Sequence, residues 1–379
     1  MDTDQFFHLI AEQFIDRISK EWKANNMKPI VGISMGDPFG NGPEITVKVL
    51  SDPEVFEWCR PLVIGDAVCL EYAAEVQKTL GNEPPVIHKV SSPAEAEFKL
   101  GVIDVLDMDI IKREDIPGDP SDPAPFMVGH SKLGGEAGFR YVEKMINMAL
   151  EHEIDATVTN AISKEAINMA GHHYSGHTEI YADMTGTKNY AMVLAHENLR
   201  VIHVSTHVSL REACDRVKYQ RELDVIRLAD QTCKKIGIED PKIGVAGLNP
   251  HCGENGMFGR EEIEEIQPAI DQAMKEGINI PDGKASPPDS IFSKAIGGWY
   301  DMVVVQYHDQ GHIPLKVKGF VYNREAKRWE SVSGINVSVG MPIVRVSVDH
   351  GTGFDTSGSG TASPASLKNA IDFAVRMAE

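Results

Sequence analysis

Apolar and polar positions divide the chain into short runs rich in β-branched residues and longer amphipathic stretches. This alternation is typical of an α/β protein with a mostly parallel sheet. The runs predict strands at 30–34, 61–64, 156–159, 191–194, 201–204, 242–246, 302–305 and 343–348. The stretches with helical periodicity predict helices at 134–151, 210–236, 260–275 and 365–378. Ser209 and Glu212 have the spacing of a capping box at the start of the second helix.

Three segments stand apart from this alternation. Apolar residues at helical spacing before Pro29 predict an N-terminal helical extension over residues 1–28. Segment 115–125 carries four prolines among acidic residues, which predicts a loop and a lobe boundary. Segment 321–333 is locally charged and predicts a hairpin or flap.

Composition and charge exclude several classes of partner. Lys and Arg number 37 against 56 Asp and Glu, so the surface field is negative and disfavours nucleic acid and anionic membranes. No apolar run is long enough to span a bilayer, and the acidic N-terminal residues do not fit a signal peptide. The five cysteines are scattered without a CxxC pair, which fits a reducing compartment. We therefore expect a cytoplasmic protein.

Three histidines follow predicted strands directly. His207, His251 and His308 come after the runs at 201–204, 242–246 and 302–305. One such histidine is usually an ordinary surface or hydrogen-bonded residue, but ligands of α/β sheets bind beyond the carboxyl ends of the strands. Three imidazoles at equivalent positions leave a coordination position open for substrate. They therefore favour a catalytic site for a divalent metal.

Other residues suit an anionic substrate. His177 and Thr178 precede a helical pattern, where free N–H groups and the helix dipole favour a phosphate or carboxylate. Lys316 follows the third histidine, and Arg345 lies in an apolar run, where a cation needs a buried partner. Lys316 alone could equally be a solvated surface charge.

Two glycine-rich segments permit close backbone approach. They are 36–44 and 349–361, and neither has the GxGxxG pattern of the usual dinucleotide fold. The glycines fit either dinucleotide binding or ordinary tight turns.

Six ordered motifs between Pro29 and the C-terminus carry a family resemblance. They are Gly36-Asp-Pro with Gly42-Pro-Glu, Gly176-His-Thr-Glu, Thr206-His-Val-Ser-Leu-Arg, Leu248-Asn-Pro-His, Tyr307-His-Asp-Gln-Gly and Ser347-Val-Asp-His-Gly-Thr. With them the chain resembles the 4-hydroxythreonine-4-phosphate dehydrogenase family of pyridoxal phosphate biosynthesis. The resemblance implies a two-lobed fold like that of isocitrate and isopropylmalate dehydrogenases, with a mostly parallel sheet and a cleft between the lobes. The expected lobes are 29–130 with 312–379, and 131–311, which carries the metal ligands and the dimer interface.

The resemblance also assigns roles to residues. It implies that His207, His251 and His308 bind one divalent ion, zinc, magnesium or cobalt, in a homodimer whose sites combine both subunits. Substrate-binding positions are His177, Thr178, Lys316, Asn336 and Arg345. Candidate catalytic residues are Lys316, Asp289 and Lys164. We expect NAD or NADP at Gly36, Asp37, Gly40, Gly42, Asp349, Gly351 and Thr352.

The expected reaction is oxidation of a small phosphorylated hydroxy acid by the nicotinamide, followed by loss of carbon dioxide. The lead substrate is 4-hydroxythreonine 4-phosphate. Phe39, Asn41 and Ala161 depart from the family pattern, and segment 321–333 looks long. These departures leave room for the relatives that oxidise D-threonate or D-erythronate 4-phosphate. A phosphate acyltransferase-like enzyme and a non-catalytic metal-binding protein are the alternatives from other classes.

Overall fold

The computed structural model describes residues 28–325, 328–332 and 334–378. The chain forms two compact units: unit 1 is Met1–Thr187 with Met341–Glu379, and unit 2 is Lys188–Gly340. The helix predicted over residues 1–28 lies outside the described residues, except for Lys28. Among the described helices, none is both long enough and apolar enough to cross a membrane.

Unit 1 is built on strands that pair in parallel throughout. In spatial order they are β3 (Val86–Val90), β4 (Val102–Asp107), β2 (Arg60–Gly65), β1 (Ile30–Ser34), β5 (Ala156–Thr159) and β13 (Arg345–Val348). Ile33 of β1 pairs with Val63 of β2 on one side and Val158 of β5 on the other. Because the strands run in one direction, the loops that follow β1, β5 and β13 leave the same edge of the sheet.

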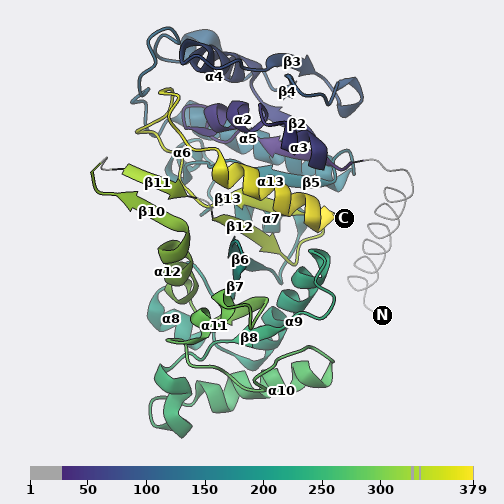
Figure 1. The fold of residues 1–379 in the computed structure, drawn as a ribbon, viewed down its shortest axis with the longest axis vertical. Coiled ribbons are helices and arrows are strands. Elements are labelled where there is room, and N and C mark those ends of the chain that lie inside the picture. Colours follow the sequence, from purple (N-terminus) through teal and green to yellow (C-terminus); the bar gives the residue numbers. More distant parts are fainter. Residues whose placement is uncertain (1–27, 326–327, 333, 379) are drawn as a thin grey trace. The chain divides into compact units, whose positions relative to one another are not determined.

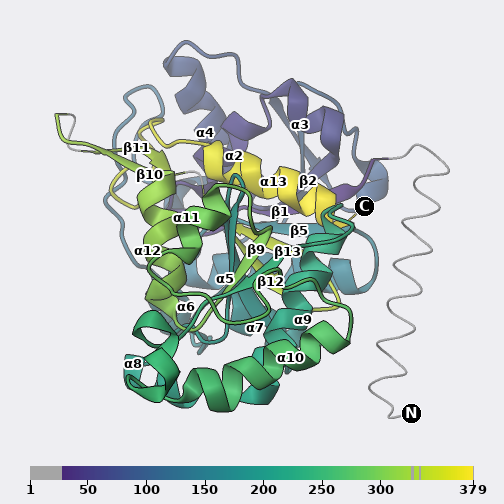
Figure 2. The same ribbon diagram turned by 60° about the horizontal axis from the view of Figure 1, so that its bottom comes forward.

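Helices cover both faces of these strands. They are α2 (Gly42–Val49), α3 (Pro53–Trp58), α4 (Ala67–Thr79), α5 (Lys132–Leu150), α6 (Lys164–Met169), α7 (His177–Thr185) and α13 (Ala365–Ala378). Within unit 1, α13 and α2 lie on one side of the strands and α5 on the other (Figure 2). Fully buried side chains such as Ile33, Leu62 and Met145 fill the space between the layers.

Unit 2 has a mixed sheet. Its strands in spatial order are β12 (Ile335–Val339), β6 (Ala191–His196), β7 (Leu199–His203), β9 (Met302–Val305) and β8 (Ile243–Val245). The pairs β12–β6 and β6–β7 are antiparallel, whereas β7–β9 and β8–β9 are parallel. The carboxyl ends of β7, β9 and β8 therefore lie at one edge, where the three predicted ligand loops begin.

The helices of unit 2 are α8 (Leu210–Asp215), α9 (Tyr219–Lys235), α10 (Gln267–Lys275), α11 (Ile291–Ile296) and α12 (His308–Gly319). Helix α9 packs on β7, β8 and β9, and α11 packs on β7 and β9 (Figure 1). Ile291 and Leu315 join Val201 and Val303 in one buried core cluster. Strands β10 (Phe320–Asn323) and β11 (Arg328–Val332) form a separate antiparallel pair.

These elements confirm the α/β prediction, and the hairpin predicted at 321–333 is present as β10 and β11. The loop predicted at 115–125 is also present, since only Asp115 belongs to an element, a short 3-10 turn. The helix predicted over 210–236 is wrong as one element. It is divided into α8 and α9 because Lys218 has an extended backbone.

The compact units have other bounds than the expected lobes, 29–130 with 312–379 and 131–311. Strand β5 pairs with β1, and α5 packs on β1 and β2. Residues 131–187 therefore belong to the first compact unit. Helix α12 packs on β6 and β7, which places residues 312–340 in the second.

Candidate active site

In unit 1, a buried cation meets the start of a helix. Arg345, the first residue of β13, is 2% exposed. Its Nη1 donates to the hydroxyl of Thr178 at 3.4 Å, and its Nη2 donates to the hydroxyl of Thr159 at 3.4 Å. Thr178 lies in the first turn of α7, and Thr159 is the last residue of β5. Since free N–H groups of a helix start also favour negative charge, this corner suits a phosphate or carboxylate.

Protonation strengthens this preference for an anion. Burial lowers the pKa of Arg345 to about 10, which leaves the side chain charged at neutral pH. Burial, together with the charge of Arg345, lowers the pKa of His177 well below its ordinary value. His177 is therefore a neutral imidazole, and its Nε2 is buried without a hydrogen-bond partner among the described residues. The structure thus brings together His177, Thr178 and Arg345, and their role in substrate binding stays a prediction.

The two glycine-rich segments of unit 1 are in contact. The N–H of Asn41 donates to the carbonyl of Thr352 at 2.8 Å. A Cβ on Gly40 would lie 2.7 Å from the same carbonyl oxygen, so only glycine permits this approach. The residues predicted to bind the dinucleotide therefore meet in unit 1, where Gly36 to Gly42 are buried and Asp349 to Thr352 are at least partly exposed.

Asp37 places a buried acid where the two segments meet. Burial raises the pKa of Asp37 to about 6, and the bond from the N–H of Phe39 and the charge of His130 lower it by less. Its Oδ2 is buried without a hydrogen-bond partner among the described residues. A carboxyl group in this state can accept a hydrogen bond from a bound hydroxyl or amide.

The loop after β5 brings Lys164 to the same region. The N–H of Asp37 donates to the carbonyl of Ala161 at 2.9 Å. Lys164 begins α6 three residues later and is exposed. His130, to which the sequence analysis gives no role, lies here too: its Nδ1 is 2.6 Å from the hydroxyl of Ser163. No local sequence pattern marks His130, because its partners come from other loops of the fold.

In unit 2, two of the three predicted metal ligands are neighbours. The ring centroids of His207 and His308 lie 5.6 Å apart. His308 begins α12 directly after β9, and His207 follows β7. His312, one helical turn beyond His308, stacks on it at 3.5 Å between centroids and directs its Nδ1 to the His308 carbonyl at 2.8 Å. The pair fits two positions around a shared ion.

The third predicted ligand does not complete this pair within one chain. His251 lies in the segment Pro250–Gly256, where His251, Cys252, Gly253, Glu254 and Asn255 all have positive φ. Over residues 28–325, 328–332 and 334–378, no group of three or more His, Cys, Asp or Glu side chains is placed to hold a metal ion.

The other site residues predicted in unit 2 are Lys316, Asn336 and Asp289, and each has its own surroundings. The ammonium of Lys316 lies 4.1 Å from the ring centroid of Phe320. The side-chain amide of Asn336 lies 3.1 Å from the sulfur of Met192. Asp289 is exposed in the turn before α11. The assignment of the catalytic base stays a prediction, with Lys316, Asp289 and Lys164 as its candidates.

Comparison with known proteins agrees with the resemblance read from the motifs. A family model described as "Pyridoxal phosphate biosynthetic protein PdxA" matches residues 57–374. A protein of Oceanobacillus iheyensis assigned as a D-threonate 4-phosphate dehydrogenase is 43% identical over 352 residues, which cover 93% of this chain and 98% of that protein. A relative with the same assignment from Symbiobacterium thermophilum is 39% identical, over 91% of this chain and 95% of its own length.

Solved structures agree as well. The 4-hydroxythreonine-4-phosphate dehydrogenase of Burkholderia phymatum is 38% identical with a TM-score of 0.74, over 92% of this chain and 98% of that one. The enzyme of the same name from Klebsiella pneumoniae is 36% identical with a TM-score of 0.75, over 93% and 100%. The chain therefore belongs to the PdxA family of pyridoxal phosphate biosynthetic proteins.

Proposed function

We propose that the chain is an oxidoreductase that oxidises a four-carbon, 4-phosphorylated hydroxy acid with NAD or NADP. The observation that carries this proposal is the buried cation Arg345 at the first turn of α7. A buried guanidinium favours an anionic ligand, because charge-assisted hydrogen bonds to an anion are stronger than bonds to neutral hydroxyls. The dehydrogenase names of the relatives agree with a substrate of this kind.

D-threonate 4-phosphate is the substrate to test first, because two relatives assigned to it are 43% and 39% identical to this chain. 4-Hydroxythreonine 4-phosphate is the second candidate, since the solved enzymes of that name are 36–38% identical. Both molecules carry a phosphate, a carboxylate and a hydroxyl on the β-carbon. The anion site of unit 1 suits either one.

The residues of unit 1 bind and orient this substrate. Arg345 and Thr178 donate hydrogen bonds to one anionic group, and the neutral His177 offers a further donor or acceptor without adding charge. The family resemblance also assigns Lys316 and Asn336, in unit 2, to substrate binding. The dinucleotide binds along the joined glycine segments.

A divalent ion is the second proposed partner of the substrate. His207 and His308 would hold it in one copy of the chain, and His251 would come from the second copy of a homodimer. When bound, such an ion polarises the substrate hydroxyl and the carbonyl formed from it. His312 holds the ring of His308 in place by stacking and by its bond to the His308 carbonyl.

The reaction balances as an oxidative decarboxylation. The carbinol carbon gives a hydride to the nicotinamide, and the hydroxyl gives its proton to a base, for which Lys316, Asp289 and Lys164 are candidates. The β-keto acid formed then loses its carboxylate as carbon dioxide, and the carbon left behind takes up a proton.

A substrate panel tests this proposal. D-threonate, D-erythronate and 4-hydroxythreonine 4-phosphates would be incubated with the protein, a divalent metal and either dinucleotide, while reduced nicotinamide absorbance and released carbon dioxide are followed. We expect both signals with at least one substrate, and loss of both in EDTA. No reduction across the panel would reject the proposal. Phosphate-dependent acyl transfer that persists in EDTA would favour an acyltransferase instead.

A further inference from the structure

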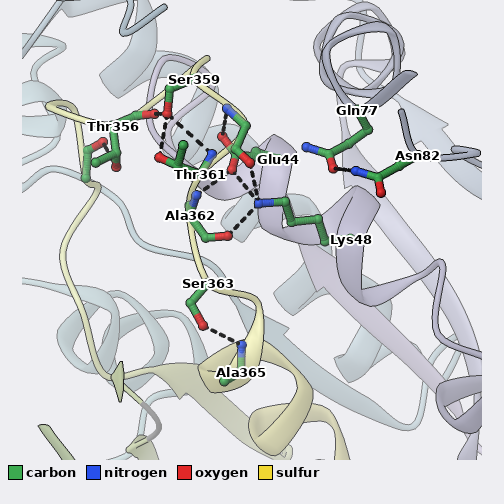
Figure 3. Close-up of polar contacts among 12 residues, drawn as sticks. Glu44, Lys48, Gln77, Asn82, Thr356, Ser359, Thr361, Ala362, Ser363 and Ala365 are labelled. Carbon is green, nitrogen blue, oxygen red and sulfur yellow. Dashed lines mark hydrogen bonds and ion pairs between the residues drawn. The ribbon is translucent and has the colours of Figure 1, made fainter. Parts of the chain in front are cut away.

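One ion pair of unit 1 contacts alternate peptide groups of the second glycine-rich segment. The carboxylate of Glu44 accepts from the N–H of Gly360 at 3.0 Å and from the N–H of Ala362 at 2.6 Å. The ammonium of Lys48 donates to the carbonyls of the same two residues, each at 2.7 Å. Figure 3 shows both side chains pointing from α2 toward this segment. Glu44 and Lys48 also contact each other at 2.8 Å.

The hydrogen bonds of Glu44 and Lys48 to this segment are shielded from water and involve charged groups, and both properties strengthen them. The side chain of Glu44 is 4% exposed and that of Lys48 is 19% exposed, so water competes little for their hydrogen bonds. Each bond involves a charged group, and such bonds are about twice as strong as neutral ones. Removing either partner would leave the other charge buried without compensation.

The segment that they contact is rich in glycine, and its other hydrogen bonds are mostly internal, such as those from the N–H groups of Thr356 and Ser357 to the carbonyl of Gly353. Gly353, Gly358 and Gly360 have φ values of +61°, +82° and +75°, in the left-handed region that favours glycine. A glycine-rich loop loses much backbone entropy when it is ordered. The contacts to Glu44 and Lys48 offset that loss before any ligand arrives.

Helix α2 also connects this segment to the first glycine loop. The N–H of Asn41, at the N-terminus of α2, donates to Thr352 at one end of the segment. Glu44 and Lys48, one and two turns further along α2, contact the other end at Gly360 and Ala362. A single short helix therefore sets the position of both glycine segments.

We infer that Glu44 and Lys48 are positioning residues that hold segment 352–362 in its ligand-ready shape, and so raise affinity for the dinucleotide without touching it. This inference rests on the proposed use of NAD or NADP. If the segment is ordered beforehand, binding does not have to supply the ordering free energy. Loss of the ion pair should therefore weaken the dinucleotide selectively.

The test compares Lys48→Met with Lys48→Arg in the full chain. We expect Lys48→Met to raise the dissociation constant of the dinucleotide about tenfold, which corresponds to about 1.4 kcal/mol. Lys48→Arg, which keeps the charge and several donors, should recover most of the affinity. The KM of the phosphorylated substrate and kcat at saturating dinucleotide should change less than about twofold. Amide hydrogen exchange of peptides spanning 353–365 should become faster in Lys48→Met alone.

Lys368→Met is the matched control, because the ion pair of Lys368 in the same unit is with Asp52 and Glu54 and not with residues 352–362. It should leave dinucleotide affinity unchanged. Faster exchange in Lys48→Met with unchanged dinucleotide affinity would overturn the inference and leave the proposed function standing. A wild-type chain that binds neither NAD nor NADP would instead reject the proposed cofactor, and the inference with it. If Lys48→Met does not fold, Glu44→Gln provides the same comparison.

Discussion

The guanidinium of Arg345 lies 3.4 Å from the hydroxyl of Thr178, at the first turn of α7. A buried positive charge and the positive end of a helix dipole thus act on the same point. The ring of Tyr181, one turn along α7, lies 5.9 Å from the guanidinium carbon and supports it from the apolar side. These contacts fix the direction from which an anion can approach Arg345.

Replacing Arg345 by Ala should weaken substrate binding by removing charge-assisted hydrogen bonds to one anionic group. Such bonds are worth about 1.5–3 kcal/mol, so we expect the substrate KM to rise about 10- to 100-fold, with a smaller change in kcat. Steady-state kinetics at saturating dinucleotide would measure both. Arg376→Ala is the control, since Arg376 pairs with Asp372 on α13. An unchanged KM in Arg345→Ala would contradict the anion-binding role.

Replacing His308 or His207 by Ala should remove most of the bound divalent ion. Each change takes away one of the few ligands, and the ion is then held by too few donors. His312→Ala should lower the affinity by about tenfold, because it only orients His308. Metal content after dialysis, and the visible absorbance of the cobalt-loaded protein, would measure both effects. His88→Ala, which alters a histidine bonded to Asp104, is the control and should retain the ion.

Wild-type protein tests whether the metal site exists and whether it needs a second copy of the chain. If dialysed wild-type protein holds no divalent ion at any protein concentration, the predicted metal site is rejected. If it holds the ion only where it is dimeric, the dependence on concentration would support a site completed by His251 of a second copy. Metal content and oligomeric state should therefore be measured on the same samples.

Much of the fold could be predicted because buried strands carry a strong local signal. The predicted bounds of β1, β5, β9 and α13 match the structure. Parallel strands that are buried on both faces read as continuous apolar runs, as Met302–Val305 does. The proximity of Thr178 to Arg345 was predictable for the same reason, since both residues lie at the ends of such elements.

Other features depended on contacts that no local pattern contains. Strand β3 was not predicted because it is half-exposed and carries His88 and Lys89 among its apolar residues. The break between α8 and α9 was missed because Val217 continues the apolar periodicity while Lys218 leaves the helical conformation. The contact of Glu44 with Gly360 joins residues from opposite ends of the sequence.

Gly36 should tolerate a side chain less well than Gly81, although both have left-handed backbones, with φ of +79° and +87°. A Cβ on Gly36 would lie 2.5 Å from the carbonyl oxygen of Ala161, whereas a Cβ on Gly81 meets nothing within 4 Å. Gly81→Ala should cost about 1–2 kcal/mol for its backbone alone. Gly36→Ala should cost about 1–3 kcal/mol more, because the loop must move. Urea unfolding would measure both, and equal losses would contradict the close approach of Gly36 to Ala161.

Glu222 should make the protein less stable as the pH rises. It is fully buried in α9, where the side-chain amide of Gln306 donates to its Oε2 at 3.4 Å, and its Oε1 has no hydrogen-bond partner among the described residues. Its pKa is raised from 4.5 to about 8: burial is the largest cause, Gln306 and Arg221 act against it, and Glu262 and Glu265 add to it. Between these pKa values the folded chain keeps a proton that the unfolded chain has lost, so stability falls as pH increases and levels off above about 8.

Replacing Glu222 by Gln removes this titration with little change in size. From about pH 6.5 to 8, wild-type unfolding free energy should fall by up to about 1.4 kcal/mol per pH unit, whereas that of Glu222→Gln should stay nearly constant. Asp37 and Asp155, whose pKa values are raised to about 6, act mainly below this range. Urea unfolding at each pH would measure the slopes. Glu276→Gln is the control, because the pKa of Glu276 is lowered to about 2 and its titration ends well below pH 6.5. Parallel slopes for wild type and Glu222→Gln would show that Glu222 is already ionised in the folded chain, and that its charge is compensated in the core.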